Sequence, residues 1–570
     1  MRKVANRTIT THTDTHILYQ RFMKYKDPYV WIPLAISLAI VGGMMLGDLF
    51  SGKPYVIDYD RKLNTIFNLI ADDYVDTVTI PDLVEKAVPK ILTDLDPHTV
   101  YIPAKDLTTV NDELEGSFSG IGIAFAIFDD TIRVTQIVPG GPSEKAGLLA
   151  GDRIIKINDS TFVGPNLNQT DIRDKHLKGA KNTSVKLGIK RNGNTDLLNF
   201  NVVRGDVPQK SVDAAYMVEK ETGYIKVNRF GRTTYDEFLN ALISLKSTGA
   251  EKFIIDLRGN AGGYMEMAIL MVNEFLPQNQ LIVFTKGREK RNDSEVWSDG
   301  NGSFQNDEIV VLIDELSASA SEIFAGAIQD NDRGLIIGRR SFGKGLVQRQ
   351  FTLPDSSAIR MTISRYYTPS GRCIQKDYKH GEDEYNQELL DRYSHGELYS
   401  QDSIRIDTTQ IFVTAHGRKV YGGGGIIPDI FVPNDTSGIT SYYMKVANAG
   451  LLQRFAYRYV DTSRNEFTKI SNYKDLLSHL PNDDVLLNDF VYYASRNGVP
   501  ARWYYINISR QLLTSQLKAL IAQYALGDNA FYAIFNEDDN NIDAAIKAFN
   551  KHLAEFPITE EIKNNGEIRN

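Results

Sequence analysis

Residues 309–344 read IVVLIDELSASASEIFAGAIQDNDRGLIIGRRSFGK, and this segment sets the architecture of the surrounding chain. It opens on an apolar, β-branched run of buried-strand length, continues through small and hydroxyl side chains, and takes up helical spacing from Glu322 onward. A strand that breaks at serines and opens a helix presents a hydroxyl beside unpaired backbone N–H groups. Nucleophilic attack on a carbonyl requires both parts, an attacking oxygen and donors for the oxyanion. The segment therefore predicts an α/β fold with a serine site at a helix start.

Ser319 also has a purely structural interpretation. Ser319-x-x-Glu322 fits the helix capping box, in which the serine satisfies an orphan N–H group and the glutamate reaches back. A nucleophilic serine needs a base as well, and no histidine lies between His176 and His380. The base candidate of this segment is Lys344, which stands between two glycines.

Lys344 can act as a base only while its amine is neutral. From a reference pKa near 10.4, neutrality at pH 7 needs a downward pKa shift of roughly 3 units, or about 4 kcal/mol. Burial in an apolar pocket can supply that shift. A carboxylate beside the amine favours the ammonium form, so we interpret Glu322 as an orienting or capping group and not as a third member of a relay.

The motif SASASE, with Lys344 and Gln348 following Ser319 at this spacing, resembles the carboxyl-terminal processing (tail-specific) proteases. These are serine peptidases with a Ser/Lys dyad on a crotonase-like α/β core. The resemblance implies that Ser319 is the nucleophile, Lys344 the general base and Gln348 the support of the lysine. It also implies that Ala320 gives one N–H group to the oxyanion hole.

Composition and a rejected motif narrow the function classes. Gly338-x-x-x-x-Gly343-Lys344 looks like a phosphate loop, but Gly345 stands where that loop has the Ser or Thr that holds magnesium. The net charge of −8 over 570 residues argues against a nucleic-acid binder. A single cysteine excludes internal disulfides and a cysteine zinc site, and no metal-ligand spacing is present. We therefore expect no metal and no cofactor.

The N-terminal region predicts a membrane anchor. Residues 1–28 are rich in Lys and Arg, and residues 29–47 carry no charge and would span about 28 Å as a helix. The basic side is expected in the cytoplasm. This makes the chain a single-pass protein of a bacterial inner membrane, with its catalytic part facing the periplasm. A cleaved signal peptide and a buried core helix are the alternatives.

Residues 55–115 predict helices, and residues 116–205 resemble a PDZ domain inserted ahead of the core. A glycine-rich turn at 116–123 runs into a strand, and such a turn can direct N–H groups at a carboxylate while the strand pairs with an added peptide. Residues 142–148 and 151–158 match the interior of PDZ domains in the same order. The resemblance assigns the peptide-carboxylate loop to four residues: Gly120, Ile121, Gly122 and Ile123. His98, in the family-like stretch at 95–102, is interpreted as structural.

Residues 206–435 predict the protease core, because strands and helices alternate as in a parallel sheet. Residues 256–263, DLRGNAGG, resemble the family turn that supplies the second half of the oxyanion hole, through either Gly262 or Gly263. A glycine helix start needed only for tight packing is the alternative. Residues 376–410 are interpreted as an insertion or lid, and residues 436–570 as a helical region without recognisable chemistry.

The combined prediction is a membrane-anchored serine endopeptidase that recognises protein C-terminal tails through its PDZ domain and hydrolyses peptide bonds with a Ser/Lys dyad. One alternative is a catalytically inactive PDZ adaptor that presents C-termini to another protease. Another is a crotonase-like relative that binds a small ligand. The expected partners are proteins or peptides held by their C-termini and the membrane through residues 29–47, with a second copy of the chain or an adaptor protein also considered.

Overall fold

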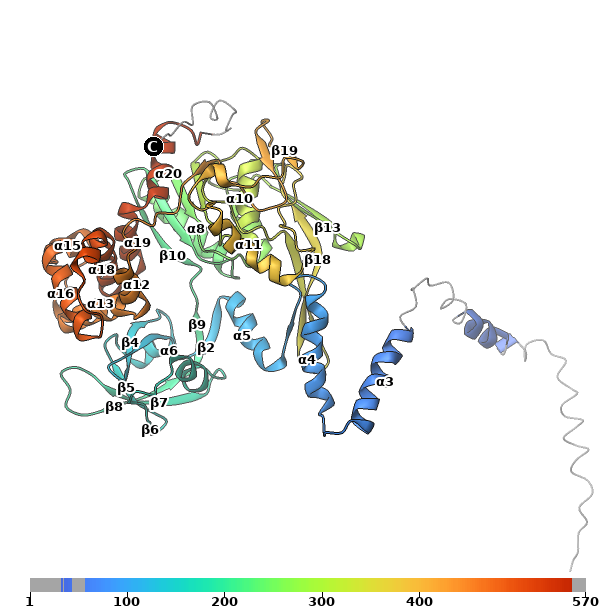
Figure 1. Ribbon diagram of the computed structural model, residues 1–570, viewed down its shortest axis with the longest axis horizontal. Helices are drawn as coiled ribbons and strands as arrows, with labels where there is room; N and C mark the ends of the chain where they lie inside the picture. The colour runs from blue at the N-terminus through green and yellow to red at the C-terminus, as the bar shows by residue number, and fades with distance from the viewer. Residues whose placement is uncertain (1–31, 34, 44–56, 556–570) are drawn as a thin grey trace, which may run out of the picture. The chain divides into compact units, whose positions relative to one another are not determined.

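The computed structural model describes residues 32–33, 35–43 and 57–555 (Figure 1). The chain divides into two units, one up to Ala87 and one from Val88 onward. The first contains α3 (Ile57–Asp73) and the beginning of α4 (Ile80–Thr93). Part of the predicted membrane segment 29–47 lies outside the described residues, and within the described part no helix combines the length and the apolar character needed to cross a bilayer.

A six-stranded sheet forms the centre of the second unit. Its order is β10-β11-β12-β15-β16-β21, and only β10 runs antiparallel to its neighbour. The strands are β10 (Val212–Met217), β11 (Thr222–Val227), β12 (Lys252–Asp256), β15 (Glu308–Ile313), β16 (Leu335–Gly338) and β21 (Ile430–Phe431). The inner strands are apolar on both faces, as parallel strands covered on both sides are.

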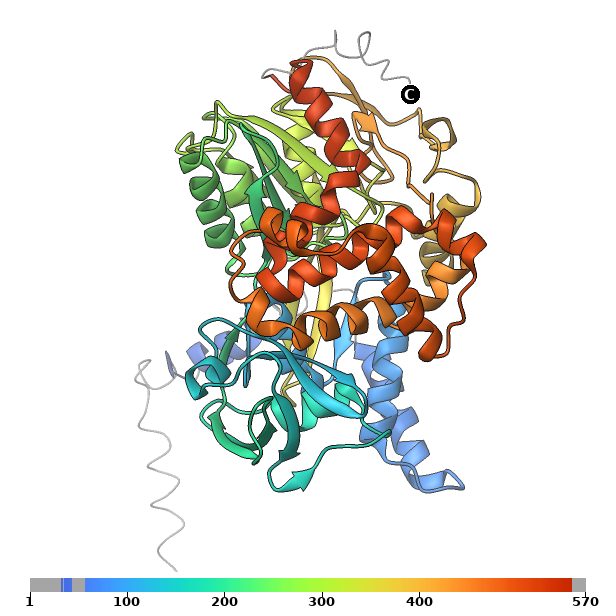
Figure 2. The same ribbon diagram turned by 90° about the vertical axis from the view of Figure 1, so that its left-hand side faces the viewer.

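Helices cover both faces of this sheet. One face packs against α8 (Thr234–Ser247), α9 (Met265–Asn273) and α10 (Ala320–Asp330) through side chains such as Phe238, Met271 and Phe324. The other face packs against α20 (Asn540–Asn550), which contributes Ile542, Ala545 and Phe549. Figure 2 shows α20, in red, beside the green strands. The predicted α/β architecture is therefore present; the crotonase-like description stays a prediction.

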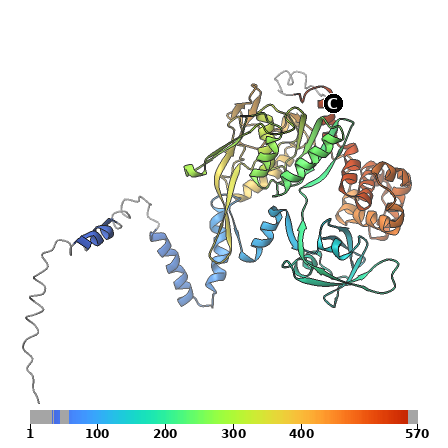
Figure 3. The same cartoon turned by 180° about the vertical axis from the view of Figure 1, so that it is seen from behind.

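A second, antiparallel sheet carries part of the candidate site. Its order is β1-β18-β13-β14, with β17 paired to the other edge of β18 (yellow in Figure 3). The strands are β1 (Val100–Ile102), β13 (Leu281–Gly287), β14 (Ser294–Trp297), β17 (Leu346–Thr352) and β18 (Ala358–Tyr367). The 376–410 segment contains α11 (Glu382–Ser394) and η3 (Gln401–Ser403), and a small β19 (Ile411–Val413)–β20 (Lys419–Tyr421) hairpin follows.

The predicted PDZ region folds around a core of its own, drawn from residues 121–202. Its main sheet has the order β3-β4-β5-β7-β8, with β6 on β5, so β3 is an edge strand. Helix α5 (Ala104–Glu115) precedes this region. The elements of the region are β2 (Ser117–Gly120), β3 (Ile123–Phe128), β4 (Thr131–Ile137), α6 (Pro142–Ala146), β5 (Arg153–Ile157), β6 (Ser160–Thr161), α7 (Gln169–Asp171), η1 (Ile172–Leu177), β7 (Ser184–Lys190), β8 (Leu198–Val203) and β9 (Gly205–Pro208).

The predicted C-terminal helical region contributes to two cores. Most of its helices surround a cluster that includes Phe455, Leu487 and Leu517, whereas α20 belongs to the central sheet. The helices of the first group are α12 (Ser441–Asn448), α13 (Leu451–Thr462), α14 (Arg464–Phe467), α15 (Tyr473–His479), α16 (Asp483–Arg496), α17 (Trp503–Ile508), α18 (Arg510–Leu526) and α19 (Asp528–Phe535). The predicted domain boundaries stay predictions.

Candidate active site

Ser319 lies at the start of α10, directly after the loop that follows β15. Its backbone has φ 56° and ψ −112°, a region that residues other than glycine rarely adopt. The turn after β12 packs against it. A methyl group added at Gly262 would lie 2.8 Å from the Ser319 Cβ atom and 2.9 Å from the Ala320 nitrogen. Only glycine leaves room for this contact, and so the glycine turn lies directly against Ser319 and the start of α10.

Glu322 connects the serine to the loop that carries the lysine. Its carboxylate is fully buried and accepts hydrogen bonds from the Ser341 hydroxyl (2.5 Å) and from the backbone N–H groups of Gly343 (2.7 Å), Lys344 (2.8 Å) and Ser319 (2.9 Å). Burial raises the pKa of Glu322, while these four donors act to lower it. The position fits the predicted orienting role.

Tyr366 makes a second connection between the same two residues. Its buried hydroxyl lies 3.0 Å from the Ser319 carbonyl oxygen and 2.6 Å from the Lys344 carbonyl oxygen, within hydrogen-bond distance of both. The main chains of Ser319 and Lys344 are thus held by one carboxylate and one phenol. The structure therefore links the main chains of the predicted nucleophile and the predicted base, although the two residues lie on different elements.

The surroundings of the Lys344 amine lower its pKa from the ordinary value of a lysine. Its Nζ atom donates to Gln348 Oε1 (3.1 Å), the contact expected of a supporting glutamine. Burial, followed by the positive charge of Arg360, lowers the pKa of Lys344, while Asp96 and Glu322 act in the opposite direction. A lowered pKa is the direction that a lysine base requires.

The stretch before β1 supports Gln348 from the other side. Gln348 Nε2 donates to the main-chain carbonyl of His98. The Asp96 carboxylate fixes this turn by accepting from the backbone N–H groups of His98 and Thr99, both at 2.9 Å. Burial, and next the charge of Lys344, lowers the pKa of His98 to about 4, so its ring is neutral at pH 7. Its predicted structural role agrees with this geometry.

The predicted oxyanion donors differ in whether their N–H groups already bind an acceptor. Gly262 donates its N–H to Asn260 Oδ1 (2.8 Å), which commits that group. The N–H groups of Gly263 and Ala320 donate to no acceptor within the described residues. A methyl group at Gly263 would lie 2.2 Å from the Phe230 carbonyl oxygen, so the turn tolerates only glycine there. The geometry therefore favours Gly263 over Gly262 as the partner of Ala320.

The predicted carboxylate loop borders a groove on the PDZ region. A cavity of about 240 Å³ lies between β3 and η1, and its lining includes Phe118, Ile121, Gly122, Leu177 and Lys178. Among the strands of the described chain, β3 pairs with β4 alone, which leaves its other edge open for an added strand. Ile121 and Gly122 turn their carbonyl groups inward to the N–H groups of Ser143 and Val138. Within the described residues, one side chain reaches that open edge: Gln169 Nε2 donates to the Phe125 carbonyl.

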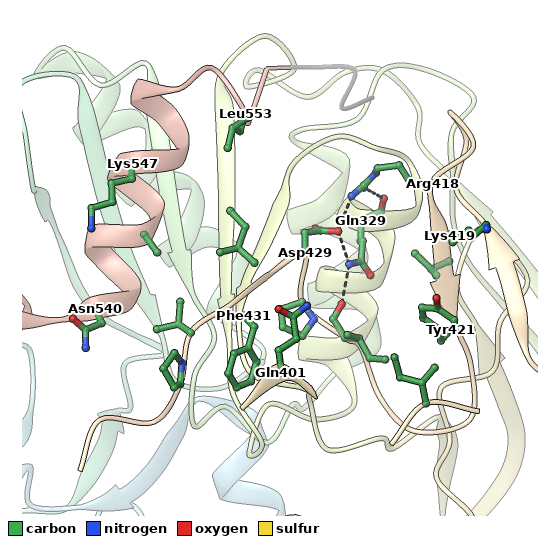
Figure 4. A pocket seen from close by; sticks show the side chains of 18 of the residues that line it. Gln329, Gln401, Arg418, Lys419, Tyr421, Asp429, Phe431, Asn540, Lys547 and Leu553 are labelled. Atoms are coloured by element: carbon green, nitrogen blue, oxygen red, sulfur yellow. Dashed lines mark hydrogen bonds and ion pairs between the residues drawn. The ribbon is translucent and has the colours of Figure 1, made fainter. Parts of the chain in front are cut away.

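A larger pocket of about 680 Å³ lies apart from these residues, between α20 and the 401–433 segment (Figure 4). No predicted site residue lines it. Some of its polar groups bind one another: Arg418 pairs with Asp429 (2.6 Å), and Gln329 donates to the same carboxylate (3.0 Å). The pocket therefore has no apparent place in the chemistry of Ser319.

The residue that sequence reasoning missed is Tyr385 on α11, whose hydroxyl lies 2.7 Å from His98 Nε2. Residues 376–410 have no strong hydrophobic periodicity, and nothing in them indicates which side chain turns inward. Its contact joins residues 287 positions apart, which a single sequence cannot reveal.

Three family models match the chain. The model of peptidase family S41 matches residues 221–382, and that of the PDZ domain matches residues 119–202. Residues 442–527 match a family of unknown function.

Similar proteins carry corresponding names. The carboxy-terminal-processing protease of Bartonella bacilliformis is 37% identical over 322 residues, which is 55% of this chain and 72% of that protein. Carboxy-terminal processing protease CtpB of Bacillus subtilis is 32% identical over 352 residues, 61% of this chain and 71% of that protein. Among solved structures, the photosystem II D1 C-terminal processing protease is 26% identical, covers 56% of this chain and 91% of its own, and superposes with a TM-score of 0.31.

Proposed function

We propose a mechanism for this chain from the premise that it belongs to the carboxy-terminal-processing proteases, the serine-type peptidases of family S41. Neutral Lys344 takes the Ser319 proton, and the serine oxygen attacks the scissile carbonyl carbon. The N–H groups of Ala320 and Gly263 stabilise the oxyanion. Lys344 then protonates the leaving amine, and water hydrolyses the acyl-enzyme.

One observation carries this proposal more than any other. Glu322 and Tyr366 each hydrogen-bond the main chains of both Ser319 and Lys344, which supports a working dyad over a capping serine with a distant lysine. The Glu322–Ser319 contact of a helix cap is also present. The two interpretations are compatible, because the same carboxylate that caps the helix also fixes the lysine loop.

A serine-reactive fluorophosphonate tests the dyad. The wild-type chain is expected to be labelled, Ser319→Ala to lose the label, and Lys344→Ala to react at least about 100-fold more slowly, as expected for loss of a general base. Ser321→Ala is the matched control. Its hydroxyl donates to the Asn260 carbonyl (2.8 Å) two residues from the nucleophile, and so labelling should persist. An unlabelled, fully folded wild type would favour the inactive PDZ adaptor.

Substrate recognition is proposed to use the groove on β3. A C-terminal tail would add as a strand to the open edge, with its carboxylate at the loop of residues Gly120–Ile123. A peptide with a free carboxylate should then bind more tightly than its amide, measured by fluorescence anisotropy. Equal affinities would remove the carboxylate loop from the mechanism.

Two glycines offer a matched pair for the same test. Gly122→Ala places a methyl group 3.2 Å from Pro142 in the loop at φ +76°, and it should weaken tail binding. Gly140→Ala carries the same backbone strain, φ +75°, with open space around the new atom. Similar losses in both variants would show that strain, and not the loop, controls the affinity.

Membrane anchoring through residues 29–47 is proposed from the sequence alone, together with a catalytic part on the periplasmic side of a bacterial inner membrane. The support is nineteen uncharged residues behind a basic tail. Fusing residues 1–50 to a reporter active only in the periplasm tests orientation, and fractionation of the full chain tests retention. Light scattering on the purified chain measures its oligomeric state and so tests whether a second copy of the chain is a partner.

A further inference from the structure

Helix α11 reaches the lysine side of the site through one side chain, Tyr385. This side chain is 2% exposed, and its hydroxyl lies 2.7 Å from Nε2 of His98, with the two rings edge-on at 5.3 Å. The main-chain carbonyl of His98 accepts from Gln348, and Gln348 Oε1 accepts from Lys344 Nζ. Three successive hydrogen bonds therefore lead from a distant helix to the proposed base.

The surroundings hold Tyr385 in one position. The Lys376 ammonium lies 4.1 Å from the centroids of both the Tyr385 and Phe342 rings, and it also donates to the Tyr385 carbonyl (3.1 Å). From the next turns of α11, Arg392 donates to the carbonyl oxygens of Ser341 (2.7 Å) and Phe342 (3.2 Å). The helix is thus fixed to the same loop that leads into Lys344.

We propose that Tyr385 is a positioning residue for the peptidase reaction. Tyr385 holds the ring of His98 and so fixes the main-chain carbonyl of that residue. The fixed carbonyl orients the Gln348 amide, and the amide positions the Lys344 amine. The inference rests on the proposed role of Lys344 as the base. Tyr385 makes no hydrogen bond with Ser319 within the described residues, and the proposed effect is therefore on the lysine.

Burial and the neighbouring charges together set the pKa values along this contact chain. Arg360 on β18, Asp96 before β1 and Glu322 on α10 act on Lys344. Lys344, Asp96 and Lys376 act on His98. For both groups burial is the largest influence, and it lowers the pKa of each. Loosening the chain at Tyr385 admits water beside the amine. The pKa of Lys344 then rises toward its ordinary value, and less of the lysine is neutral at pH 7.

Tyr385→Phe tests the proposal because it removes only the hydroxyl and keeps the ring against Phe342 and Lys376. Fluorophosphonate labelling at pH 7 should slow by about 3- to 10-fold, and the acid limb of the rate–pH profile should move to higher pH. With a peptide substrate, kcat should fall while KM stays unchanged. Tyr393→Phe, on an exposed position of the same helix, is the matched control and should behave as the wild type.

A wild-type rate–pH profile in a folded Tyr385→Phe variant would overturn the proposal. If that variant does not fold, His98→Gln and His98→Ala replace it. The glutamine can still bond the Tyr385 hydroxyl and should keep a profile closer to the wild type than alanine does, whereas identical profiles would overturn the proposal. Full labelling of Lys344→Ala would instead defeat the proposed function, which distinguishes the two failures.

Discussion

At the scale of single residues, the site depends on a serine held in a backbone conformation suited to glycine. Ser319 has a positive φ, and a backbone conformation of this kind lowers the stability of the folded state by about 1–3 kcal/mol. Its neighbours enforce the conformation: Glu322 accepts from its N–H group, Tyr366 binds its carbonyl oxygen, and Gly262 packs against its Cβ atom. These contacts hold the backbone of Ser319 in the strained conformation at the start of α10.

Ser319→Gly should relieve this strain, whereas Ser319→Ala should keep it. Glycine also has more conformational entropy than alanine in the unfolded chain, which lowers the free energy of unfolding by roughly 0.5–1 kcal/mol. We therefore expect Ser319→Gly to have a free energy of unfolding about 1 kcal/mol above that of Ser319→Ala. Urea unfolding of the two inactive variants measures this difference. A lower stability for the glycine variant would mean that the backbone at residue 319 is not strained.

His98 should make the stability of the protein depend on pH. The pKa of its ring falls from 6.5 to about 4 on folding, chiefly through burial. Between these values the unfolded chain binds more protons, so stability rises with pH across this window and is lost as the pH falls from 6.5 toward 4. His98→Gln should flatten the slope of unfolding free energy against pH. His479→Gln, an exposed position, is the control, and equal slopes in all three proteins would contradict the assignment.

At the scale of elements, three segments supply the proposed site: the turn after β12 carries the donor Gly263, the start of α10 carries the donor Ala320, and the loop before β17 carries the base Lys344. The order of strands and helices around Ser319 could be predicted from the sequence, because buried parallel strands and amphipathic helices have distinct periodicities. The PDZ region could be predicted as well, from two matched segments. Such local patterns can be recognised in one sequence without any knowledge of tertiary contacts.

Two features of the site could not be predicted in this way. Gly262 and Gly263 are indistinguishable in the sequence, and the choice depends on whether the Asn260 side chain occupies an N–H group. The approach of Tyr385 to His98 depends on how α11 packs, which no local spacing records. Both features depend on contacts between residues that are distant in the sequence or identical in type, and so they become visible only in the folded structure.

Gly263→Ala should disrupt the turn after β12. The added methyl group would lie 2.2 Å from the Phe230 carbonyl oxygen at φ +145°, so the backbone must move away from α10. We expect at least about a 100-fold loss of Ser319 labelling, the size reported for removing an oxyanion donor. Gly259→Ala, at φ +71° with open space around the new atom, should lose only about 1 kcal/mol of stability and retain labelling. Labelling at the wild-type rate in Gly263→Ala would exclude this donor.

At the scale of the whole molecule, the central sheet is closed by segments far apart in the sequence. Helices α8, α9 and α10 cover the face next to Ser319, and α20 covers the opposite face, where Phe549 is 1% exposed. The region between them, from α12 to α19, packs around its own core. The helical pattern of 436–570 was visible in the sequence, but not the fact that its last helix serves a different core.

Phe549→Ala should destabilise the sheet that supports the site. Removing a buried phenylalanine typically costs 3–5 kcal/mol, and this one lies against strands that also carry α10 on their other face. Denaturant unfolding should show this loss, with Ser319 labelling falling only as the folded fraction falls. Phe535→Ala, at a 41% exposed position on α19, should lose much less. Equal losses would mean that α20 does not close the sheet.

The position of α20 in the sequence also orders events during synthesis. Ser319 and Lys344 leave the ribosome well before residues 540–550, yet the sheet beneath them stays open on one face until those residues arrive. A nascent chain therefore carries both reactive groups on an unfinished support. We expect peptide-bond cleavage to begin only once α20 has been synthesised and has packed on the sheet.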